Sequence, residues 1–331
     1  MKSEEILLLT AKDMRSLLSL NECIVAVEQA FRLYGEGKAL PPGVLGMHAR
    51  GGGFHIKAAF QELGRNYFAA KVNGNFPGNP AAFGLPTIQG VVVLCDAENG
   101  RPLAVMDSIE ITGLRTAAAT AVAAKYLAVR DSHGATICGC GKQGRMQLKA
   151  LAAVRQLKKV FAYDKNPAQA TRFAQELADE LAISVTSVTD LAAAVRRSDI
   201  CVTCTTSHEP LLGTADVAPG TFIAAVGADN PEKQEMHPDL MAKAEIVVDL
   251  IEQCASIGDL HHAIEAGVVT RSDVRAELGE VVAGKKPGRT SKEEIVIFDS
   301  TGTALQDVAA AVVAYENAER HGIGVRLNFA A

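Results

Sequence analysis

Hydrophobic positions follow different periods in the first third of the chain. Residues 19–35 carry apolar side chains at helical spacing, so a helix is predicted there. Residues 43–110 consist of short β-rich pieces divided by Gly and Pro. Two of these pieces, at 90–95 and 102–106, are predicted strands joined by a hairpin-like turn. Residues 112–127 return to an alanine-rich helical pattern, so this part of the chain predicts mixed α and β structure.

From about residue 131 strand-like runs alternate with helical stretches. This alternation is typical of an α/β fold in which helices cover both faces of a parallel sheet. A last amphipathic helix is predicted at 305–321. The predicted strands are at residues 135–140, 160–164, 183–188, 199–205, 221–227, 245–250 and 294–299.

Composition narrows the classes of function. The chain has 331 residues, with 48% hydrophobic and 21% charged, which is ordinary for a globular protein with room for two domains. A net charge of -5 gives no sign of the positive charge that is typical of nucleic-acid-binding proteins. No apolar run is long enough to span a membrane, and the N-terminus has no apolar signal core. We therefore expect a soluble protein without a nucleic-acid or membrane partner.

Cysteine and histidine pairs could indicate redox or metal chemistry. Cys201 and Cys204 form a Cys-x-x-Cys pair, but residues 199–205 resemble a strand and lack the strand-to-helix setting of a redox motif. We interpret them as buried strand cysteines, which favours a reducing cytoplasm. His261 and His262 are adjacent, and adjacent residues do not share one face of a helix or strand. We interpret them as structural or interfacial, and no metal site is predicted.

A Gly-x-Gly-x-x-Gly segment lies at residues 139–144, between a predicted strand and a predicted helix. The first glycine permits a tight turn, the second lets a pyrophosphate approach the backbone, and the third lets helix and strand pack closely. The helix N-terminus offers N–H groups and its positive dipole end to the phosphates. These features predict a dinucleotide site. Its candidate contacts in the loop are Gly139, Gly141, Lys142, Gln143 and Gly144.

Asp164 ends the next predicted strand, twenty residues after Gly144, where an acid is expected to bind the adenosine ribose. Its charge would repel the extra phosphate of NADP, so NAD is favoured. Lys165 weakens that preference and leaves NADP as the alternative. Later strand ends are expected to line the nicotinamide side of the site. The candidate cofactor contacts there are Thr205, Val226 and Gly302.

Asp229 follows one of these strand ends and is a candidate catalytic acid or base. The alternative is a helix cap, because residues 230–232 could begin a short helix.

Four cations lie in apolar or glycine-rich surroundings of the first part of the chain: His55, Lys57, Lys71 and Arg115. Buried charge needs a partner. An anionic ligand, either a substrate carboxylate or a cofactor phosphate, is one candidate partner for Lys71 and Arg115. The alternative is an internal salt bridge. His55 and Lys57 follow Gly51-Gly-Gly53, which could simply be a turn.

Seven motifs together resemble the ornithine cyclodeaminase/μ-crystallin family over nearly the whole chain. Segments 227–229, 279–284 and 298–307 are especially similar to its archaeal alanine dehydrogenase branch. The seven motifs are Lys71-Val-Asn-Gly-Asn-Phe-Pro-Gly-Asn79, Gly84-Leu-Pro-Thr87, Arg115-Thr-Ala-Ala-Ala119, Ala123-Ala-Lys-Tyr-Leu127, the glycine loop at 139–144, Gly227-Ala-Asp-Asn-Pro-Glu-Lys-Gln-Glu235 and Phe298-Asp-Ser-Thr-Gly302.

The resemblance implies a homodimer with a small amino, imino or keto acid as substrate. It implies an α+β substrate and dimerisation domain at residues 1–130, completed by the C-terminal helix at 305–331. A Rossmann domain at 131–304 would bind NAD or NADP. By matching motifs, Lys71 and Arg115 would bind the substrate and its carboxylate, and Asp229 would be the acid or base. Thr116 would contact the cofactor.

Three positions depart from the family. Gly43 stands where a basic residue commonly follows the two prolines. His55 replaces the Glu of typical ornithine cyclodeaminases and the Arg of the archaeal alanine dehydrogenase, and Lys57 replaces a usual Met. These changes suggest that carboxylate recognition has moved from position 43 to Lys57. Loss of the Glu removes a partner for ornithine's side-chain ammonium, which argues against cyclodeaminase activity.

The sequence thus predicts an NAD(P)-dependent amino acid dehydrogenase or imine reductase. In this hypothesis Arg115, Lys71 and Lys57 hold the substrate carboxylate and Asp229 moves a proton. Two alternatives stay open. One is ornithine cyclodeaminase, which forms proline and ammonia with no net redox change. The other is a non-catalytic protein that binds the cofactor, against which the presence of Asp229 argues.

Overall fold

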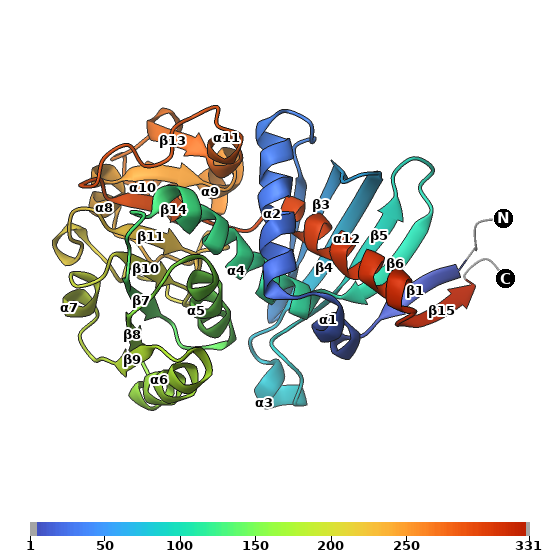
Figure 1. Ribbon diagram of the computed structural model, residues 1–331, viewed down its shortest axis with the longest axis horizontal. Helices are drawn as coiled ribbons and strands as arrows, with labels where there is room; N and C mark the ends of the chain where they lie inside the picture. The colour runs from blue at the N-terminus through green and yellow to red at the C-terminus, as the bar shows by residue number, and fades with distance from the viewer. Residues whose placement is uncertain (1–4, 329–331) are drawn as a thin grey trace. The chain divides into compact units, whose positions relative to one another are not determined.

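The computed structural model describes residues 5–328, which form two compact units (Figure 1). The first unit comprises the described parts of Met1–Arg115 and Thr303–Ala331, and the second comprises Thr116–Gly302. The first boundary between the two units along the chain lies between Arg115 and Thr116, inside helix α4 (Ser108–Leu127). The boundary predicted from the sequence, at residue 130, lies after this helix.

The first unit is built on a seven-stranded sheet in which strands far apart in sequence are neighbours. Its strands pair antiparallel, except that β1 and β6 are parallel. The predicted hairpin at 90–106 is confirmed as the β5–β6 pair. The order across the sheet is β15 (Val325–Asn328), β1 (Glu5–Leu9), β6 (Pro102–Asp107), β5 (Ile88–Asp96), β4 (Asn66–Asn75), β3 (Gly52–Glu62) and β2 (Gly43–Ala49).

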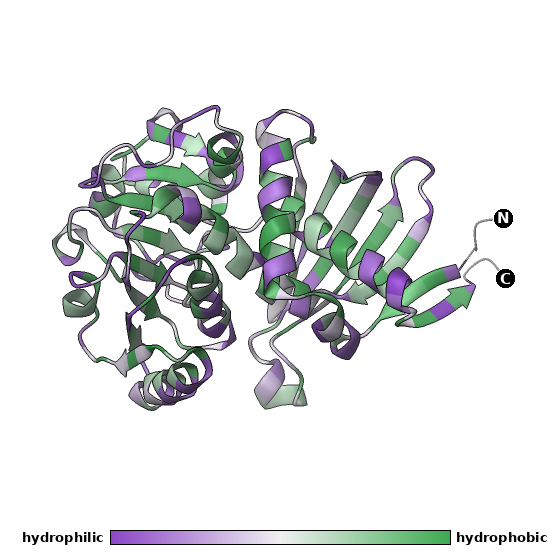
Figure 2. Ribbon diagram, in the orientation of Figure 1, coloured by the Kyte–Doolittle hydropathy of each residue, from purple (hydrophilic) through white to green (hydrophobic). Residues whose placement is uncertain are grey.

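Helix α12 (Ala304–His321) lies against strands β3, β4 and β5, and helix α2 (Leu20–Gly35) packs on α12 (Figure 1). Burial on β3 and β4 alternates with a period of two, and their buried face is the one that α12 covers. Hydrophobic and hydrophilic positions alternate around α2, as its helical spacing predicted (Figure 2). The shorter helices of this unit are α1 (Ala11–Leu17) and α3 (Asn79–Phe83).

The second unit contains an eight-stranded sheet whose neighbouring strands all pair in parallel. The sheet runs outward in both directions from β7, the strand before the glycine loop. This order is the one expected of a doubly wound dinucleotide-binding sheet. The order is β13 (Val274–Glu277), β12 (Glu245–Val248), β14 (Val296–Asp299), β11 (Phe222–Ala225), β10 (Ile200–Thr203), β7 (Gly134–Cys138), β8 (Lys159–Tyr163) and β9 (Ser184–Ser187).

All seven strands predicted for this part of the chain are present, and the predicted α/β fold class is confirmed. Strand β13 was not predicted, because its sequence Val-Arg-Ala-Glu is short and half polar. Helices connect the strands, among them α5 (Lys142–Val154), α6 (Pro167–Leu181), α7 (Leu191–Val195), α8 (Pro238–Lys243), α9 (Ile251–Ile257), α10 (Asp259–Glu265) and α11 (Leu278–Val282).

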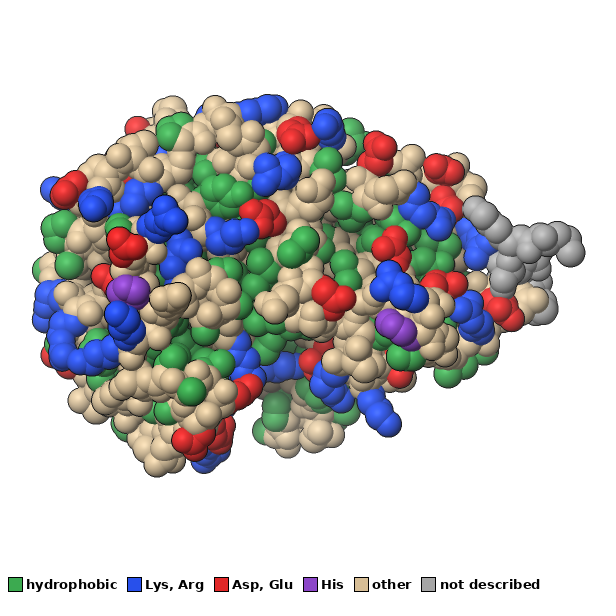
Figure 3. Space-filling model, viewed as in Figure 1, with side chains coloured by type: hydrophobic (Ala, Val, Ile, Leu, Met, Phe, Trp, Pro, Cys, Tyr) green, Lys and Arg blue, Asp and Glu red, His purple; other side chains and the backbone are tan. Residues whose placement is uncertain are grey.

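The surface mixes charges of both signs. Lys, Arg, Asp and Glu side chains are interspersed over the face drawn in Figure 3. Within residues 5–328, no helix combines the length and the apolar character needed to cross a membrane. All seven cysteines are free thiols, and burial raises the pKa of the Cys201 and Cys204 thiols. These two thiols are therefore poor nucleophiles.

Candidate functional site

The glycine loop has the geometry that was predicted from the sequence for each of its three glycines. Gly139 has a φ of 102°, in the left-handed region that favours glycine. A Cβ on Gly144 would lie 2.0 Å from the carbonyl oxygen of Gly139, so close packing of α5 on the turn requires glycine there. Gly141 faces open space within 4 Å, which leaves its backbone accessible to a ligand.

Asp164 follows β8 and is directed at this loop. Its Oδ2 accepts the Cys140 N–H at 2.9 Å and the Gln169 amide at 3.1 Å, and its Oδ1 accepts the Asn166 N–H at 2.9 Å. The carboxylate is thus fixed beside the glycine turn, at the position where an acid contacts an adenosine ribose in dinucleotide-binding sheets.

A cavity of about 450 Å³ opens at this edge of the sheet of the second unit. It has the size of a small-molecule site. At the start of α5, the Gln143 amide nitrogen is buried and has no hydrogen-bond partner within residues 5–328, which leaves a donor available at the helix N-terminus. Residues lining the cavity include Gly139, Gly141, Asp164, Lys165, Thr205 and Thr206.

Glu235 is a buried residue that the sequence analysis quoted in a motif but gave no role. Its Oε1 accepts both the backbone N–H and the hydroxyl of Thr205 at 2.7 Å, and its Oε2 accepts the Gly227 N–H at 2.8 Å. Glu235 therefore ties the loop after β10 to the loop after β11. Val226 in the latter loop is 8% exposed and donates its N–H to the Thr203 carbonyl.

Gly302 and Thr116 are the two remaining candidate cofactor contacts. Gly302 has a φ of 77° and donates its N–H to the Asp249 carboxylate at 2.6 Å. Thr116 is half-buried within α4. Their contact with a cofactor stays a prediction.

Asp229 lies in the turn after β11 and forms an ion pair with Lys233 at 2.7 Å. The Asp229 side chain is 52% exposed, whereas that of Lys233 is 14% exposed. Residues 230–232 form a turn rather than a helix, and the Asn230 side chain, not Asp229, accepts the Glu232 N–H. The helix-cap alternative for Asp229 therefore has no structural basis. The catalytic role of Asp229 stays a prediction.

The predicted cations of the first unit converge on the face that α12 covers. Lys57 on β3 and Lys71 on β4 are direct cross-strand partners, an arrangement that is unfavourable for like charges. Arg115 joins them from α4. The exposed fractions of Lys57, Lys71 and Arg115 are 8%, 3% and 5%. His55 is two residues before Lys57 on β3, so both side chains lie on the same face of the sheet, and His55 is half-buried.

Asp307 on α12 is the carboxylate at the centre of this cluster, and the sequence analysis gave it no role. It lies 2.8 Å from Lys71 Nζ and 3.0 Å from Arg115 Nε, and it is 2% exposed. The neighbouring Gln306 accepts a hydrogen bond from Arg115 at 2.8 Å. The internal salt bridge considered for Lys71 and Arg115 is therefore present. The acid that forms it could not be named from the sequence, because α12 brings it from 236 residues along the chain.

Asp307 pairs with both Lys71 and Arg115, and one carboxylate does not neutralise two cations. Lys57, Lys71 and Arg115 all act on Asp307 and together lower its pKa against the effect of burial. The pKa of Lys71 falls to about 7, because burial and the charges of Arg115 and Lys57 outweigh the attraction of Asp307. Lys71, Arg115 and Asp307 sum to one positive charge (2 − 1) when Lys71 is protonated, so the cluster is suited to an anion.

The histidine pair on α10 departs from one expectation. The ligand atoms of His261, His262 and Glu265 lie within 4.8 Å of one another, although adjacent residues were expected to diverge. His261 Nε2 lies 3.5 Å from the Glu265 carboxylate, and His262 Nε2 is hydrogen-bonded to the Lys233 carbonyl at 2.9 Å. Each ring therefore has a partner within the protein, and the absence of a bound metal stays a prediction.

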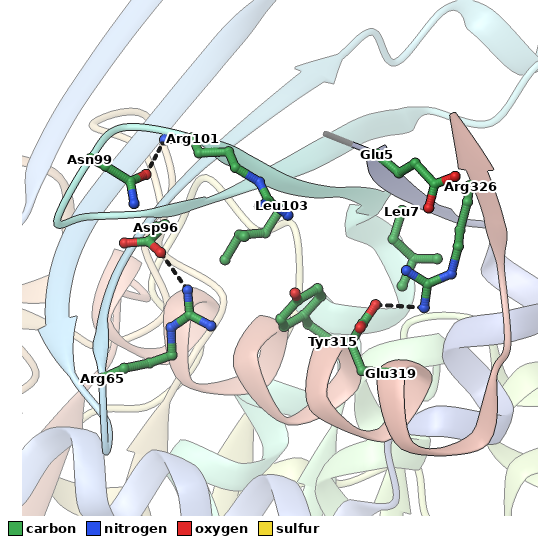
Figure 4. Close-up of a pocket in the computed structure, with 10 residues that line it drawn as sticks. All are labelled: Glu5, Leu7, Arg65, Asp96, Asn99, Arg101, Leu103, Tyr315, Glu319 and Arg326. Carbon is green, nitrogen blue, oxygen red and sulfur yellow. Dashed lines mark hydrogen bonds and ion pairs between the residues drawn. The ribbon is translucent and has the colours of Figure 1, made fainter. Parts of the chain in front are cut away.

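A smaller cavity of about 210 Å³ lies in the first unit, beside the hairpin turn of β5 and β6 (Figure 4). Arg65 pairs there with Asp96, and Arg326 pairs with Glu319 at 2.8 Å. Its lining contains three arginines and three acids, so its charges balance. It lacks the excess of positive charge that distinguishes the cluster around Asp307.

The fold and these two groups of residues define a class of protein. The second unit is a Rossmann domain with a dinucleotide-type glycine loop, and the first unit contains a buried cluster with excess positive charge. The family model of the ornithine cyclodeaminase/mu-crystallin family matches residues 4–322, and the chain belongs to this family.

Three comparisons extend the family assignment. Alanine dehydrogenase of Archaeoglobus fulgidus is 43% identical over 98% of this chain and 99% of its own length. A solved archaeal alanine dehydrogenase dimer with bound NAD has a TM-score of 0.94, at 43% identity, and covers 98% of this chain and 99% of its own. The Δ1-pyrroline-2-carboxylate reductase of Thermococcus litoralis, solved with NADH and L-proline, has a TM-score of 0.92 at 35% identity, covering 97% and 100%.

Proposed function

We propose that this chain is an NAD-dependent oxidoreductase that acts on the C–N bond of a small α-amino or α-imino acid. Its relatives include an alanine dehydrogenase and a Δ1-pyrroline-2-carboxylate reductase, which are oxidoreductases of this class. The prediction of such an enzyme made from the sequence is thereby confirmed. Which residues bind the substrate and cofactor, and which substrate is used, belong to the proposal.

The observation that carries the proposal is the excess of positive charge around Asp307. Burial makes uncompensated charge costly, so the cluster gains most from a ligand that brings negative charge. A substrate carboxylate is such a ligand, because Arg115 can form paired hydrogen bonds with it and Lys71 can add a third. We assign Arg115, Lys71 and Lys57 to carboxylate binding, and we place His55 next to them on the same strand face.

The cofactor site is assigned to the second unit. Solved relatives hold NAD or NADH, and the open backbone at Gly141 together with the unpartnered Gln143 amide fits a pyrophosphate. Asp164 is positioned to accept hydrogen bonds from ribose hydroxyls, so NAD is favoured over NADP. The other proposed contacts are Gly139, Lys142, Gly144, Thr116, Thr205, Val226 and Gly302.

The nicotinamide supplies or accepts the hydride when it is bound. The chain's own residues have two tasks in this reaction. Arg115, Lys71 and Lys57 hold the carboxylate and so orient the adjacent Cα. Asp229 exchanges a proton at the substrate nitrogen or with water that attacks the imine carbon. Lys71 has a pKa of about 7, so it can also gain or lose a proton near neutral pH.

The test is a screen of α-keto acids with ammonia or methylamine, and of cyclic imino acids, for oxidation of NADH. We expect activity in the wild type and a loss of about 10²–10⁴-fold in kcat for Asp229→Asn, with NADH binding retained. The exposed Asp179→Asn serves as the control. No oxidation above background by folded wild-type protein contradicts the proposal.

The same screen distinguishes the alternatives. Proline and ammonia formed from ornithine without net NADH consumption would establish a cyclodeaminase. Tight NADH binding without turnover of any substrate would indicate a binding protein.

We also propose that the chain forms a homodimer. On the sheet of the first unit, strand positions that alternate with the buried face carry exposed apolar side chains, including Phe54, Phe68 and Val91. Several exposed apolar side chains on one face of a sheet fit an interface, and the archaeal alanine dehydrogenase was solved as a dimer. Light scattering should give twice the chain mass, and Phe68→Glu should shift the protein toward the monomer.

The predicted cytoplasmic location is retained as a proposal. The seven free thiols support it, because a reducing compartment keeps thiols unpaired.

A further inference from the structure

Four buried acids gather at the carboxyl edge of the parallel sheet in the second unit, and none of them has been given a catalytic role. Glu235, Asp249, Asp259 and Asp299 are each 0% exposed. Asp249 directly follows strand β12, and Asp299 is the last residue of β14. Asp259 begins α10, and Glu235 lies in the segment after β11. Glu235 and Asp299 lie in motifs that resemble the family, but the resemblance implied no function for any of the four acids.

Two of the acids clamp the strand-end loops. Glu235 binds Thr205 and Gly227, as described above. Asp249 accepts the Gly302 N–H at 2.6 Å and the Thr301 hydroxyl at 3.1 Å. A Cβ on Gly227 would lie 2.5 Å from the Glu235 carboxyl carbon, so this contact allows no side chain at position 227. Both clamps therefore act on loops that carry proposed cofactor contacts.

The other two acids, Asp259 and Asp299, hold the backbone of Glu235 and the start of α10 in place. Asp259 Oδ1 accepts the backbone N–H groups of Glu235 and Met236, both at 2.8 Å. Asp299 Oδ2 accepts the Leu260 N–H at 2.9 Å and so fixes the start of α10. A Cβ on Gly258 would lie 2.5 Å from Asp299 Oδ2, which shows how closely Asp299 is seated against the α9–α10 junction.

Each of these two carboxyl groups has one oxygen that receives no hydrogen bond. Asp259 Oδ2 and Asp299 Oδ1 are both buried, and neither has a donor among residues 5–328. A buried acceptor without a donor has a free-energy cost, which is larger when the group is charged. A proton placed on either oxygen converts it to a donor and removes this cost for both groups if it is shared between them.

The electrostatic surroundings favour such a proton. The Glu235 carboxylate acts on Asp259, whereas the carboxyl groups of Asp259 and Asp249 act on Asp299. The Cys254 thiol also faces Asp299 and Asp249. Burial and these like charges raise the pKa of Asp259 to about 7 and hold that of Asp299 well above its usual range, despite the N–H groups directed at them. Two adjacent buried carboxyls cannot both ionise readily.

We propose that Asp259 and Asp299 share one proton, and that this proton keeps Glu235 in place against Thr205 and Gly227 so that the loops after β10 and β11 hold the cofactor. The four acids thus act as positioning residues. The sharing of the proton is argued from the two buried oxygens that have no donor among residues 5–328 and from the contact of Asp299 with Leu260, the residue after Asp259. Its effect on the cofactor rests on the proposed function.

The sign of the pH dependence follows from proton counting. The folded state retains a proton that the unfolded chain releases above about pH 4. The stability contributed by the pair is therefore full below about pH 4 and is lost as the pH rises through the folded pKa, near 7 for Asp259. When the proton leaves, the two carboxylates repel each other and Glu235 loses its support. NADH affinity should therefore fall above pH 7, where the folded protein loses this proton.

Asp299→Asn tests the sharing of the proton. Asparagine keeps an oxygen for the Leu260 N–H and supplies a permanent amide donor toward Asp259. We expect this variant to fold as well as wild type at pH 5 and to unfold less readily at pH 8. The unfolding constant of wild type should rise by up to tenfold per pH unit relative to the variant between pH 5 and the folded pKa of Asp259, about 7, and level off above it. Asp299→Ala should be destabilised at every pH, and Asp179→Asn should follow wild type.

Two further readouts separate the parts of the proposal. An infrared band of a protonated carboxyl should be present in wild type at pH 6 and absent in Asp299→Asn. The Kd for NADH should rise by up to tenfold per pH unit above pH 7 in wild type and stay flat in Asp299→Asn. Equal pH slopes of unfolding in the two proteins, or no carboxyl band, overturn the shared proton.

An unfolding difference without a difference in the NADH profile overturns the positioning role. If no protein binds NADH, the proposed function fails, while the unfolding and infrared measurements still decide whether the proton is shared.

Discussion

Replacing Asp307 by asparagine removes the negative charge at the centre of the cation cluster while nearly preserving the shape of the side chain. Asp307 forms ion pairs of 2.8 Å with Lys71 and 3.0 Å with Arg115, and all three side chains are at most 6% exposed. Breaking a buried pair by removing one partner costs about 3–5 kcal/mol, because the remaining charge is left uncompensated.

Lys71 limits this cost. Its pKa is already about 7, and loss of Asp307 lowers the pKa further, so the amine becomes neutral at small expense. Arg115 cannot lose its charge in this way. We therefore expect the lower end of the range, a loss of about 3 kcal/mol at pH 7, to apply. For a unit of this size that loss lowers the melting temperature by roughly 6–12 °C.

The assay is urea unfolding of wild type and Asp307→Asn, with the exposed Glu98→Gln in the same unit as the control. The measurements are made at pH 7 and pH 9. The destabilisation should be smaller at pH 9, because Lys71 is then largely neutral in both proteins and only the Arg115 pair is lost. An Asp307→Asn variant within about 0.5 kcal/mol of wild type at both pH values would refute the reasoning, because surface changes alone have effects of that size.

Three other predictions follow from the same contacts. A bound carboxylate favours the charged form of Lys71, so the KM for an α-keto acid should rise as the pH rises through about 7 in steady-state assays, whereas Lys71→Arg should remove this rise. Asp164→Ala should weaken NADH binding by about tenfold in a fluorescence titration, because the hydrogen bonds to the adenosine ribose hydroxyls are lost. The effect on NADPH should be smaller, because one of these hydroxyls carries a phosphate in NADPH. Gly144→Ala should destabilise the protein by about 1–3 kcal/mol in thermal unfolding, since its Cβ would lie 2.0 Å from the Gly139 carbonyl oxygen, whereas Gly113→Ala meets nothing within 4 Å and should be neutral or stabilising.

The central strands could be predicted from the sequence because burial on both faces leaves a simple signal. Every residue of β10, β11 and β14 is buried, and each strand is a short apolar run bounded by polar residues. Strand β13, at one edge of this sheet, lacks this signal. Strand β13 has a half-polar sequence, and it forms through pairing with β12, which lies some thirty residues earlier in the chain.

The candidate site could be predicted where its residues belong to one local motif. The glycine loop and Asp164 lie within 26 residues of each other, and their spacing reflects a single strand–helix–strand unit. Asp307 has no such local relation to Lys71, which is 236 residues away. The available signal was an acid in an otherwise apolar stretch of helix, but that signal does not say which cation the acid meets.

Buried charge is compensated by different means in the two units. Around Asp307 the cations outnumber the carboxylate, so compensation has to come from an anion brought by a ligand. Around Asp259 and Asp299 the charged groups are carboxylates, so compensation comes from a proton. Lowering the pH protonates Lys71 and also retains the proton on the acid pair. We therefore expect the affinities for an anionic substrate and for NADH to increase together on acidification through pH 7, although the two effects arise in different units and through charges of opposite sign.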